Sequence, residues 1–325
     1  MASTIRDVSV ISGVSTATVS RTFAKPDSVK AATREKVMEA ARLLNYQPNA
    51  IARSMALQTT EKIAFLICKK ESSILDEFYA GICEGIMKET KNSDYQLLIS
   101  TAADWETGKR NQVDGLILGG DATLDLISSY RNQGVRIVLV NNEVDGLAFP
   151  RVVSDEEAGV RMLVEHLIDR GHKKIAMLAG RFSPYICEQR FQAFRKVMKA
   201  HGLPIPEGYV QITDPDYKSA EQAAAKMLLQ ENPPTAIFGA NDEIAVGIMK
   251  AAIRLGLRIP EDIAVAGYDD SNVCRALEPE MTSVHTCRGR MGKAAAGLLL
   301  RGLQGEDLSN RKIVIPPELV IRNST

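Results

Sequence analysis

The eleven residues GVSTATVSRTF, at positions 13 to 23, combine a glycine, small hydroxyl side chains and one arginine in a short polar stretch. Thr16 and Ala17 are small enough to touch base edges in the major groove of DNA, and Arg21 can reach a guanine or a phosphate. The spacing therefore predicts that one face of a short helix reads DNA. The alternative is a capped surface helix in a generic three-helix bundle.

The distribution of charge favours the DNA-reading interpretation. The whole chain has 40 basic and 40 acidic residues, so its net charge is zero. Residues 1–60 have eight basic and four acidic side chains and a net charge of +4, which leaves −4 on the remainder. A basic segment attached to an acidic body is typical of a DNA reader joined to a sensor, because phosphate contacts supply most non-specific affinity.

Catalytic chemistry finds little support in the sequence. The four histidines, His166, His172, His201 and His285, have no metal-ligand spacing. No phosphate-binding loop and no GxSxG elbow occurs. The sequence therefore predicts a protein that is not an enzyme and that uses no cofactor and no metal.

Two polar residues follow apolar strands in the second half of the chain. Asn241 comes after IFGA and Asp269 comes after IAVAGY. Doubly wound sheets bind ligands at these strand ends, and an amide with a carboxylate suits the hydroxyl groups of a sugar. The alternative is that Asn241 caps the helix beginning at Asp242, and that Asp269 or Asp270 caps the next helix.

Local signals predict three helices in residues 4–46. Thr4 and Asp7 have the spacing of a capping box, and the first helix, with Ile5, Val8 and Ile11 inward, ends at Gly13. Ser15 is predicted to cap a second helix whose apolar face contains Val14, Val19 and Phe23. A third helix follows, with Val37, Ala40, Ala41 and Leu44 at helical spacing. This arrangement is a helix-turn-helix domain.

From Glu61 onward, apolar strands alternate with amphipathic helices. The first set of predicted strands is 63–68, 95–100, 114–118 and 136–141, and the second is 174–180, 209–213, 235–240 and 263–270. Predicted helices occupy 156–170, 187–200, 219–230 and 242–255. Continuous apolar strands between helices indicate parallel sheets that are covered on both faces. Two consecutive sets predict two lobes with a ligand between them.

Several long segments carry a family likeness. They include GVSTATVSRTF, VKAATREKVMEAARLLNYQPNAIARSM, RVVSDEEAG, HLIDRGHKKIAMLAG, ANDEIAVGIMKAAIRLGLRIPEDIAVAGYDD and EPEMTSVHT. With these segments in family order over nearly the whole chain, the sequence resembles the lactose-repressor (LacI/GalR) family of bacterial transcription regulators. The resemblance implies a homodimer, an N-terminal helix-turn-helix, a hinge helix and a core like that of periplasmic sugar-binding proteins.

The resemblance also implies which residues contact DNA. It assigns DNA contacts to Thr4, Ser15, Thr16, Ala17, Ser20, Arg21, Asn49, Ala52, Arg53 and Met55. The hinge is PNAIARSMA, residues 48–56, in which Asn49 suits a helix cap. Met55 stands where the family has a leucine that wedges into the central minor-groove step, and a methionine can serve as such a wedge.

A second set of residues is implied for the effector. It comprises Ile74, Leu75, Arg190, Asn241, Asp269 and Thr286. Arg190 matches an arginine that grips the effector in the family, although by itself it reads as an exposed helix residue. Ile74 and Leu75 replace two family aromatics and fit a core equally well. Thr286 is expected on a segment that crosses between the lobes.

One segment departs from the family pattern. Only about a dozen residues separate the strand at 95–100 from the strand at 114–118, which is near the minimum for a parallel crossover. Residues 103–112 can form about two helical turns. A thin first lobe is therefore expected.

The sequence predicts an N-terminal all-α helix-turn-helix domain (1–47), a hinge helix and linker (48–60) and a two-lobed α/β core with parallel sheets (61–325). The predicted function is a repressor that binds a pseudo-palindromic operator and responds to a carbohydrate-like effector. Because no secretion-signal pattern, long apolar run or disulfide framework is evident, a cytoplasmic location is expected. A periplasmic-type solute-binding protein is the alternative, and the sequence leaves open whether the effector releases or tightens DNA binding.

Overall fold

The computed structural model describes residues 3–24, 26–46, 59–68, 77–107, 113–144, 148–181 and 184–325. Its contacts divide the chain into two compact units, and the first boundary along the chain falls between Ile63 and Ala64. The three N-terminal helices belong to the first unit, and nearly all of two α/β lobes belongs to the second. The predicted boundaries at residues 47 and 60 stay a prediction, because residues 47–58 lie outside the described part.

The N-terminal head, residues 3–46, is all-helical. Its elements are α1 (Ile5–Ser12), α2 (Thr16–Ala24), η1 (Pro26–Ser28) and α3 (Ala31–Leu43). The backbone N–H and the hydroxyl of Thr4 both donate to the Asp7 carboxylate at 2.8 Å, which confirms the predicted capping box. Helix α1 ends at Gly13, whose φ of +67° is the left-handed conformation that favours glycine.

A small apolar core joins the three helices of the head. Val8, Val19 and Val37 are completely buried, one from each helix. The prediction that Ile11 faces inward was wrong, because its side chain is 52% exposed. Ser12 takes the buried position one turn after Val8 and donates its hydroxyl to the Val8 carbonyl at 2.6 Å.

The first lobe is a six-stranded sheet in the order β11-β5-β4-β3-β1-β2. Its strands are β1 (Lys62–Cys68), β2 (Gln96–Thr101), β3 (Gly115–Gly120), β4 (Arg136–Val140), β5 (Arg151–Ser154) and β11 (Lys312–Ile315). Its helices are α5 (Glu77–Thr90), α6 (Ala102–Thr107), α7 (Leu124–Arg131) and α13 (Arg288–Leu303). The β3–β4 pair is parallel, as predicted for this sheet. Strands β5 and β11 were not predicted, and the pairs β4–β5 and β5–β11 are parallel as well.

The second lobe repeats the architecture, with strand order β12-β10-β9-β8-β6-β7. Its strands are β6 (Ile175–Gly180), β7 (Val210–Thr213), β8 (Ala236–Gly239), β9 (Ala264–Asp269), β10 (Thr282–His285) and β12 (Glu318–Val320). Its helices are α8 (Glu156–Asp169), α9 (Pro184–Ala200), α10 (Tyr217–Leu228), α11 (Asp242–Arg254) and α12 (Val273–Ala276). The β12–β10 pair is antiparallel, whereas β10–β9, β9–β8, β8–β6 and β6–β7 are parallel.

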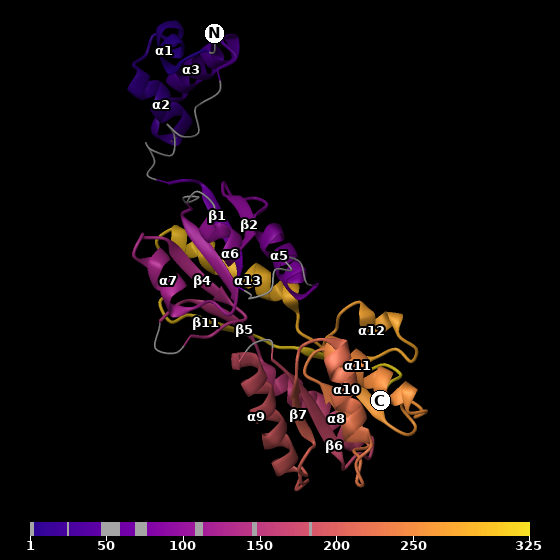
Figure 1. The fold of residues 1–325 in the computed structure, drawn as a ribbon. Helices are drawn as coiled ribbons and strands as arrows, with labels where there is room; N and C mark the ends of the chain where they lie inside the picture. The colour runs from indigo at the N-terminus through magenta and orange to yellow at the C-terminus, as the bar shows by residue number, and fades with distance from the viewer. Residues whose placement is uncertain are drawn as a thin grey trace. The chain divides into compact units, whose positions relative to one another are not determined.

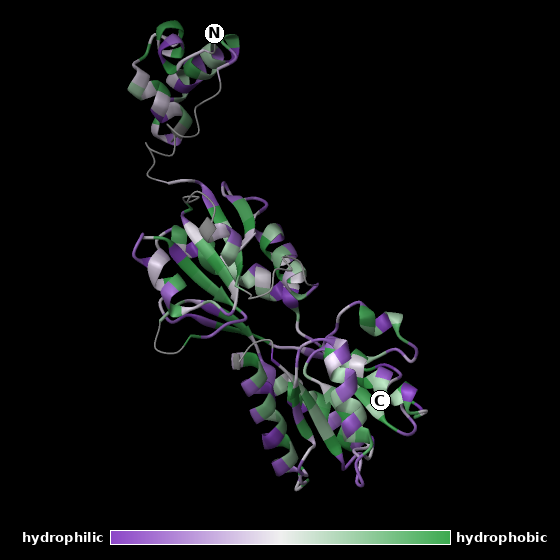
Figure 2. Cartoon of the chain, in the orientation of Figure 1, coloured by the Kyte–Doolittle hydropathy of each residue, from purple (hydrophilic) through white to green (hydrophobic). Residues whose placement is uncertain are grey.

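The lobes are not two consecutive halves of the chain. Strand β11 and helix α13 return from the C-terminal part of the chain to the first lobe, where α13 packs against α5 (Figure 1). The chain therefore passes between the lobes after β5, after β10 and after β11. The strands of both sheets are predominantly hydrophobic (Figure 2), and β3, β6 and β8 are buried along their whole lengths.

The crossover between β2 and β3 is short, as expected. Its described part contains α6, a helix of only six residues, with Trp105 buried at 8% exposure. Strand β2 lies at the edge of the sheet, and its Ile99 side chain is 41% exposed. The β2 edge of the first lobe therefore has a short helix and a partly exposed strand, which agrees with the expected thin first lobe.

Candidate functional sites

The outer face of α2 displays the side chains that were predicted to read bases. Thr16, Ala17 and Arg21 are exposed and Ser20 is half-buried, while Val19 on the opposite face is buried. The Ser15 hydroxyl accepts the backbone N–H of Thr18 at 3.2 Å, so the predicted N-cap of α2 is confirmed. The helix therefore presents small polar groups and one cation to solvent.

Of the other residues predicted to contact DNA, one lies in the head and four lie in the predicted hinge. Thr4 is exposed but its side chain is committed to the capping box of α1. Asn49, Ala52, Arg53 and Met55 lie outside the described residues. For all of these positions, the DNA contact stays a prediction.

Arg190 is the centre of a buried charge cluster in the second lobe. Its side chain is 3% exposed and lies on α9, so the reading of it as an exposed helix arginine was wrong. Nε donates to Glu156 at 2.6 Å, and Nη2 lies 3.5 Å from the Asp269 carboxylate. Nη1 donates to the carbonyl of Ala240, and the guanidinium stacks 3.6 Å from the centre of the Tyr268 ring.

Three separate elements supply this charge cluster, which consists of Arg190, Glu156, Tyr268 and Asp269. Glu156 begins α8, where the helix dipole also favours a carboxylate, and Tyr268 and Asp269 end β9. Burial disfavours the charged guanidinium, but the Glu156 and Asp269 carboxylates outweigh burial and raise the pKa of Arg190. Arg190 therefore stays charged, and its neighbours hold it in one orientation.

Asp269 has an unusual conformation and an unusual acidity. Its φ is +103° and that of Asp270 is +50°, so two successive non-glycine residues have positive φ. Burial raises the pKa of Asp269 to about 7 against the lowering effect of the Arg190 charge, and the carboxylates of Asp242 and Glu156 add smaller increases. Such perturbed groups and strained backbones gather at binding sites.

The raised pKa makes stability depend on pH. The unfolded Asp269 carboxyl titrates near 3.8 and the folded one near 7, so the folded protein binds the extra proton between these values. The free energy of unfolding due to this group therefore falls as pH rises through that window. We therefore compare the free energies of unfolding of Asp269→Asn and the unsubstituted protein by urea unfolding. The difference between them should shift by about 2 kcal/mol in favour of Asp269→Asn as the pH rises from 5.5 to 8.

The matched control for this prediction is Asp216→Asn. Asp216 caps α10, and its hydrogen bonds from Ser219 hold the pKa of its carboxyl below the ordinary value. It therefore stays ionised from pH 5.5 to 8, and its substitution leaves the pH dependence unchanged. Parallel stability profiles for Asp269→Asn and the unsubstituted protein would contradict the raised pKa.

Several buried polar atoms near the cluster have no hydrogen-bond partner among the described residues. They are Oγ of Ser154, Oγ1 of Thr286 and Nη1 of Arg288. Ser154 lies where the chain passes from β5 to α8, and Thr286 and Arg288 lie where it passes from β10 to α13. Because an unpaired buried polar group costs about 1–3 kcal/mol, these atoms suit a polar ligand.

The remaining predicted effector residues lie around the same strand ends. Asn241 caps α11 by accepting the Ile244 N–H at 2.9 Å, so the capping interpretation is confirmed. Its role toward a ligand stays a prediction, as does that of Thr286, which follows the β10 partner of Asp269 and is 1% exposed. Ile74 and Leu75 lie outside the described residues.

Sequence reasoning missed Glu156 and Tyr268 as partners of Arg190. Glu156 stands in RVVSDEEAG beside Glu157, and nothing local distinguishes the buried acid from its exposed neighbour. Tyr268 stands in the GYDD segment directly before Asp269, and its position at the end of an apolar strand was the available signal.

Comparison with known proteins agrees with this geometry. Residues 4–49 match the model of the lacI family of bacterial regulatory proteins, and residues 164–325 match that of the periplasmic binding protein-like domain. The HTH-type transcriptional repressor PurR of Vibrio vulnificus (strain CMCP6) is 32% identical over 331 residues, which cover 99% of this chain and 98% of that repressor. The chain belongs to the LacI family.

Solved structures support the assignment to the LacI family. A lac repressor dimer bound to operator and the anti-inducer ONPF is 27% identical, with a TM-score of 0.82, and the match covers 100% of this chain and 99% of that one. A complex of the transcriptional regulator CelR with cellobiose is 29% identical, with a TM-score of 0.74, covering 99% and 100% of the two chains.

The protein is therefore a LacI-family transcriptional regulator and not an enzyme. The helix-turn-helix head and the two-lobed parallel α/β core agree with the predicted fold. Among the described residues, no helix is long and apolar enough to span a membrane.

Proposed function

We propose that this protein is a repressor whose affinity for operator DNA is set by a small polar effector bound around Arg190. The observation that carries the proposal is the Arg190–Glu156–Asp269 charge cluster at the strand ends of the core. The same chain contains the exposed helix α2, which is predicted to read DNA. Because DNA is the target, the proposed place of action is the cytoplasm.

The proposed effector is a sugar or sugar derivative. The unpaired atoms near Arg190 include two hydroxyls and one guanidinium nitrogen, which can accept from and donate to several hydroxyl groups. The related regulator CelR has been solved with cellobiose. A thermal-shift screen of neutral sugars, sugar phosphates, uronic acids and purines tests the class, because a ligand that binds the folded state raises its melting temperature.

The proposed assembly is a homodimer that binds a pseudo-palindromic operator. The related lac repressor was solved as a dimer on its operator. Exposed apolar side chains on the core, including Met87, Ile253 and Leu255, provide surface that a partner subunit can cover. Light scattering after size exclusion tests this assembly, and a mass of one chain would contradict it.

Arg21 provides a test of the reading helix. Arg21→Ala is expected to weaken binding to a duplex selected by the protein from a random library, by about 1–3 kcal/mol if Arg21 contacts a base. Arg42 on α3 is exposed and has the same charge, so Arg42→Ala controls for a general loss of positive charge. Fluorescence anisotropy at two salt concentrations measures both. Equal losses in the two variants would contradict base reading by Arg21.

A further inference from the structure

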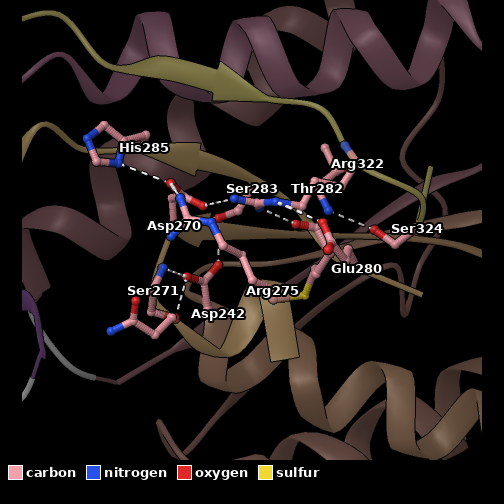
Figure 3. Close-up of polar contacts among 12 residues, drawn as sticks. Asp242, Asp270, Ser271, Arg275, Glu280, Thr282, Ser283, His285, Arg322 and Ser324 are labelled. Carbon is pink, nitrogen blue, oxygen red and sulfur yellow. Dashed lines mark hydrogen bonds and ion pairs between the residues drawn. The ribbon is translucent and has the colours of Figure 1, made fainter. Parts of the chain in front are cut away.

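A second buried network lies behind Asp269 and differs from the charge cluster around Arg190. Asp242 is the first residue of α11 and is 3% exposed. One carboxylate oxygen accepts the N–H and the hydroxyl of Ser271 at 2.6 and 2.8 Å (Figure 3). The other oxygen accepts the hydroxyl of Ser283 at 2.6 Å. Asp242 thus joins α11 to the turn after β9 and to strand β10.

Strand β9 is shaped to admit this carboxylate. Gly267 lies two residues before Asp269, and a Cβ atom added to it would lie 2.2 Å from an oxygen of Asp242. Only glycine allows that approach without displacing the carboxylate. Asp242 therefore packs directly against the backbone of the strand that ends in Asp269.

The same contacts restrain the two residues with positive φ. Ser283 donates to Asp242 and also accepts the backbone N–H of Asp270 at 3.1 Å. Asp270 is in addition paired with Arg322 and lies 3.2 Å from His285 (Figure 3). Strained backbone persists only where its surroundings fix it. The hydrogen bonds of Ser283 and Asp242 hold the backbone N–H groups of Asp270 and Ser271, directly after Asp269.

We propose that Asp242 is a positioning residue, whose carboxylate fixes the strained turn after β9 so that the Asp269 carboxylate faces Arg190. The importance of Asp242 for the response to effector rests on the proposed function, in which Asp269 belongs to the effector site. Asp242 acts through the turn, because its side chain is buried and both its oxygens accept hydrogen bonds from serine residues.

The titration of Asp269 reports this positioning without any effector. The charged groups that face Asp269 are Arg190 from α9, Arg288 from α13, Glu156 from α8 and Asp242 from α11. Burial is the main cause of its raised pKa, so release of the turn into water returns the pKa toward 3.8. Because the Asp242 carboxylate also raises the Asp269 pKa through its charge, Asp242→Asn measures the loss of that charge. A role of Asp242 confined to the stability of α11 would give Asp242→Ala and Asp242→Asn the same Asp269 pKa.

The experiment is NMR titration of the full chain with ¹³C-labelled aspartate carboxyls, in which Asp269→Asn assigns the signal. In the unsubstituted protein, the Asp269 pKa is expected at about 7. Asp242→Ala removes both the charge and the hydrogen bonds and should lower that pKa by roughly one pH unit or more. Asp242→Asn keeps hydrogen-bonding groups, so the Asp269 pKa should lie between those of the other two proteins.

Two further variants keep the test decisive. Asp216→Asn removes a helix-capping acid elsewhere in the same lobe and should leave the Asp269 pKa unchanged. If Asp242→Ala does not fold, Ser283→Ala removes the bridge between Asp242 and Asp270 and should also lower the Asp269 pKa. Equal Asp269 pKa values in Asp242→Ala and Asp242→Asn, or an unchanged value in Ser283→Ala, which keeps the Asp242 charge, would overturn the positioning role. Failure of the effector hypothesis would appear separately, as an absence of ligand-induced thermal shifts.

Discussion

Removal of residues 1–58 is expected to abolish operator binding and to leave the core folded. The head contains the reading helix and carries the basic excess of the chain, so the remaining core has a net charge of −4. An acidic core without a reading helix loses both specific recognition and phosphate attraction, and the affinity should fall by at least about 10³-fold. Fluorescence anisotropy with a library-selected duplex measures the change.

Trp105 supplies the folding control for the truncated core. It is the only tryptophan of the chain and is 8% exposed in the first lobe, so its emission reports the folding of the core in both proteins. We expect the same emission maximum and cooperative unfolding in the full chain and in the core. A folded core that binds the duplex as tightly as the full chain would contradict the assignment of DNA reading to the head.

Arg190→Ala is expected to have the largest effect of any single substitution in the core. The change leaves the Glu156 and Asp269 carboxylates without their buried counter-charge. Loss of one partner from a buried ion pair costs about 3–5 kcal/mol. Urea unfolding measures the loss, and the sugar-induced thermal shift should disappear with it.

Two variants distinguish the contribution of the Arg190 ion pairs to stability from a general effect of substitutions in α9. Arg195 lies on the same helix, is exposed and stacks on Phe191, so Arg195→Ala should change stability by about 0.5 kcal/mol or less. Arg190→Lys keeps the charge but not the planar fork that serves Glu156 and Asp269 together, so its effect should be intermediate. Equal stability of Arg190→Ala and Arg195→Ala would show that the ion pairs contribute nothing.

Local patterns in the sequence were sufficient for much of the fold. The capping box at Thr4, the Ser15 cap and the apolar strands β1 to β4 and β6 to β9 depend on neighbouring residues, and all appear in the structure. Asn241 had two possible roles, and the cap that it makes to Ile244 was among them. These features were predictable because their causes lie within a few residues of each other.

The elements that join the lobes were not predicted, because their causes lie far apart in the sequence. Strand β11 is partly exposed and pairs with β5, which lies nearly half of the chain earlier in the sequence. Its short apolar pattern therefore does not indicate a partner. The burial of Arg190 similarly depends on Glu156, 34 residues away, and on Asp269. An amphipathic helix pattern around Arg190 is compatible with exposure until those carboxylates are placed.

The most direct measurement for the central claim is operator affinity with and without the compound that gives the largest thermal shift. Anisotropy titrations of the selected duplex would be made with the unsubstituted protein and with Asp269→Asn. We expect the compound to change operator affinity about 5- to 150-fold in the unsubstituted protein and to leave it unchanged in Asp269→Asn. An equal change in both proteins would contradict control of DNA binding through the Arg190–Asp269 site.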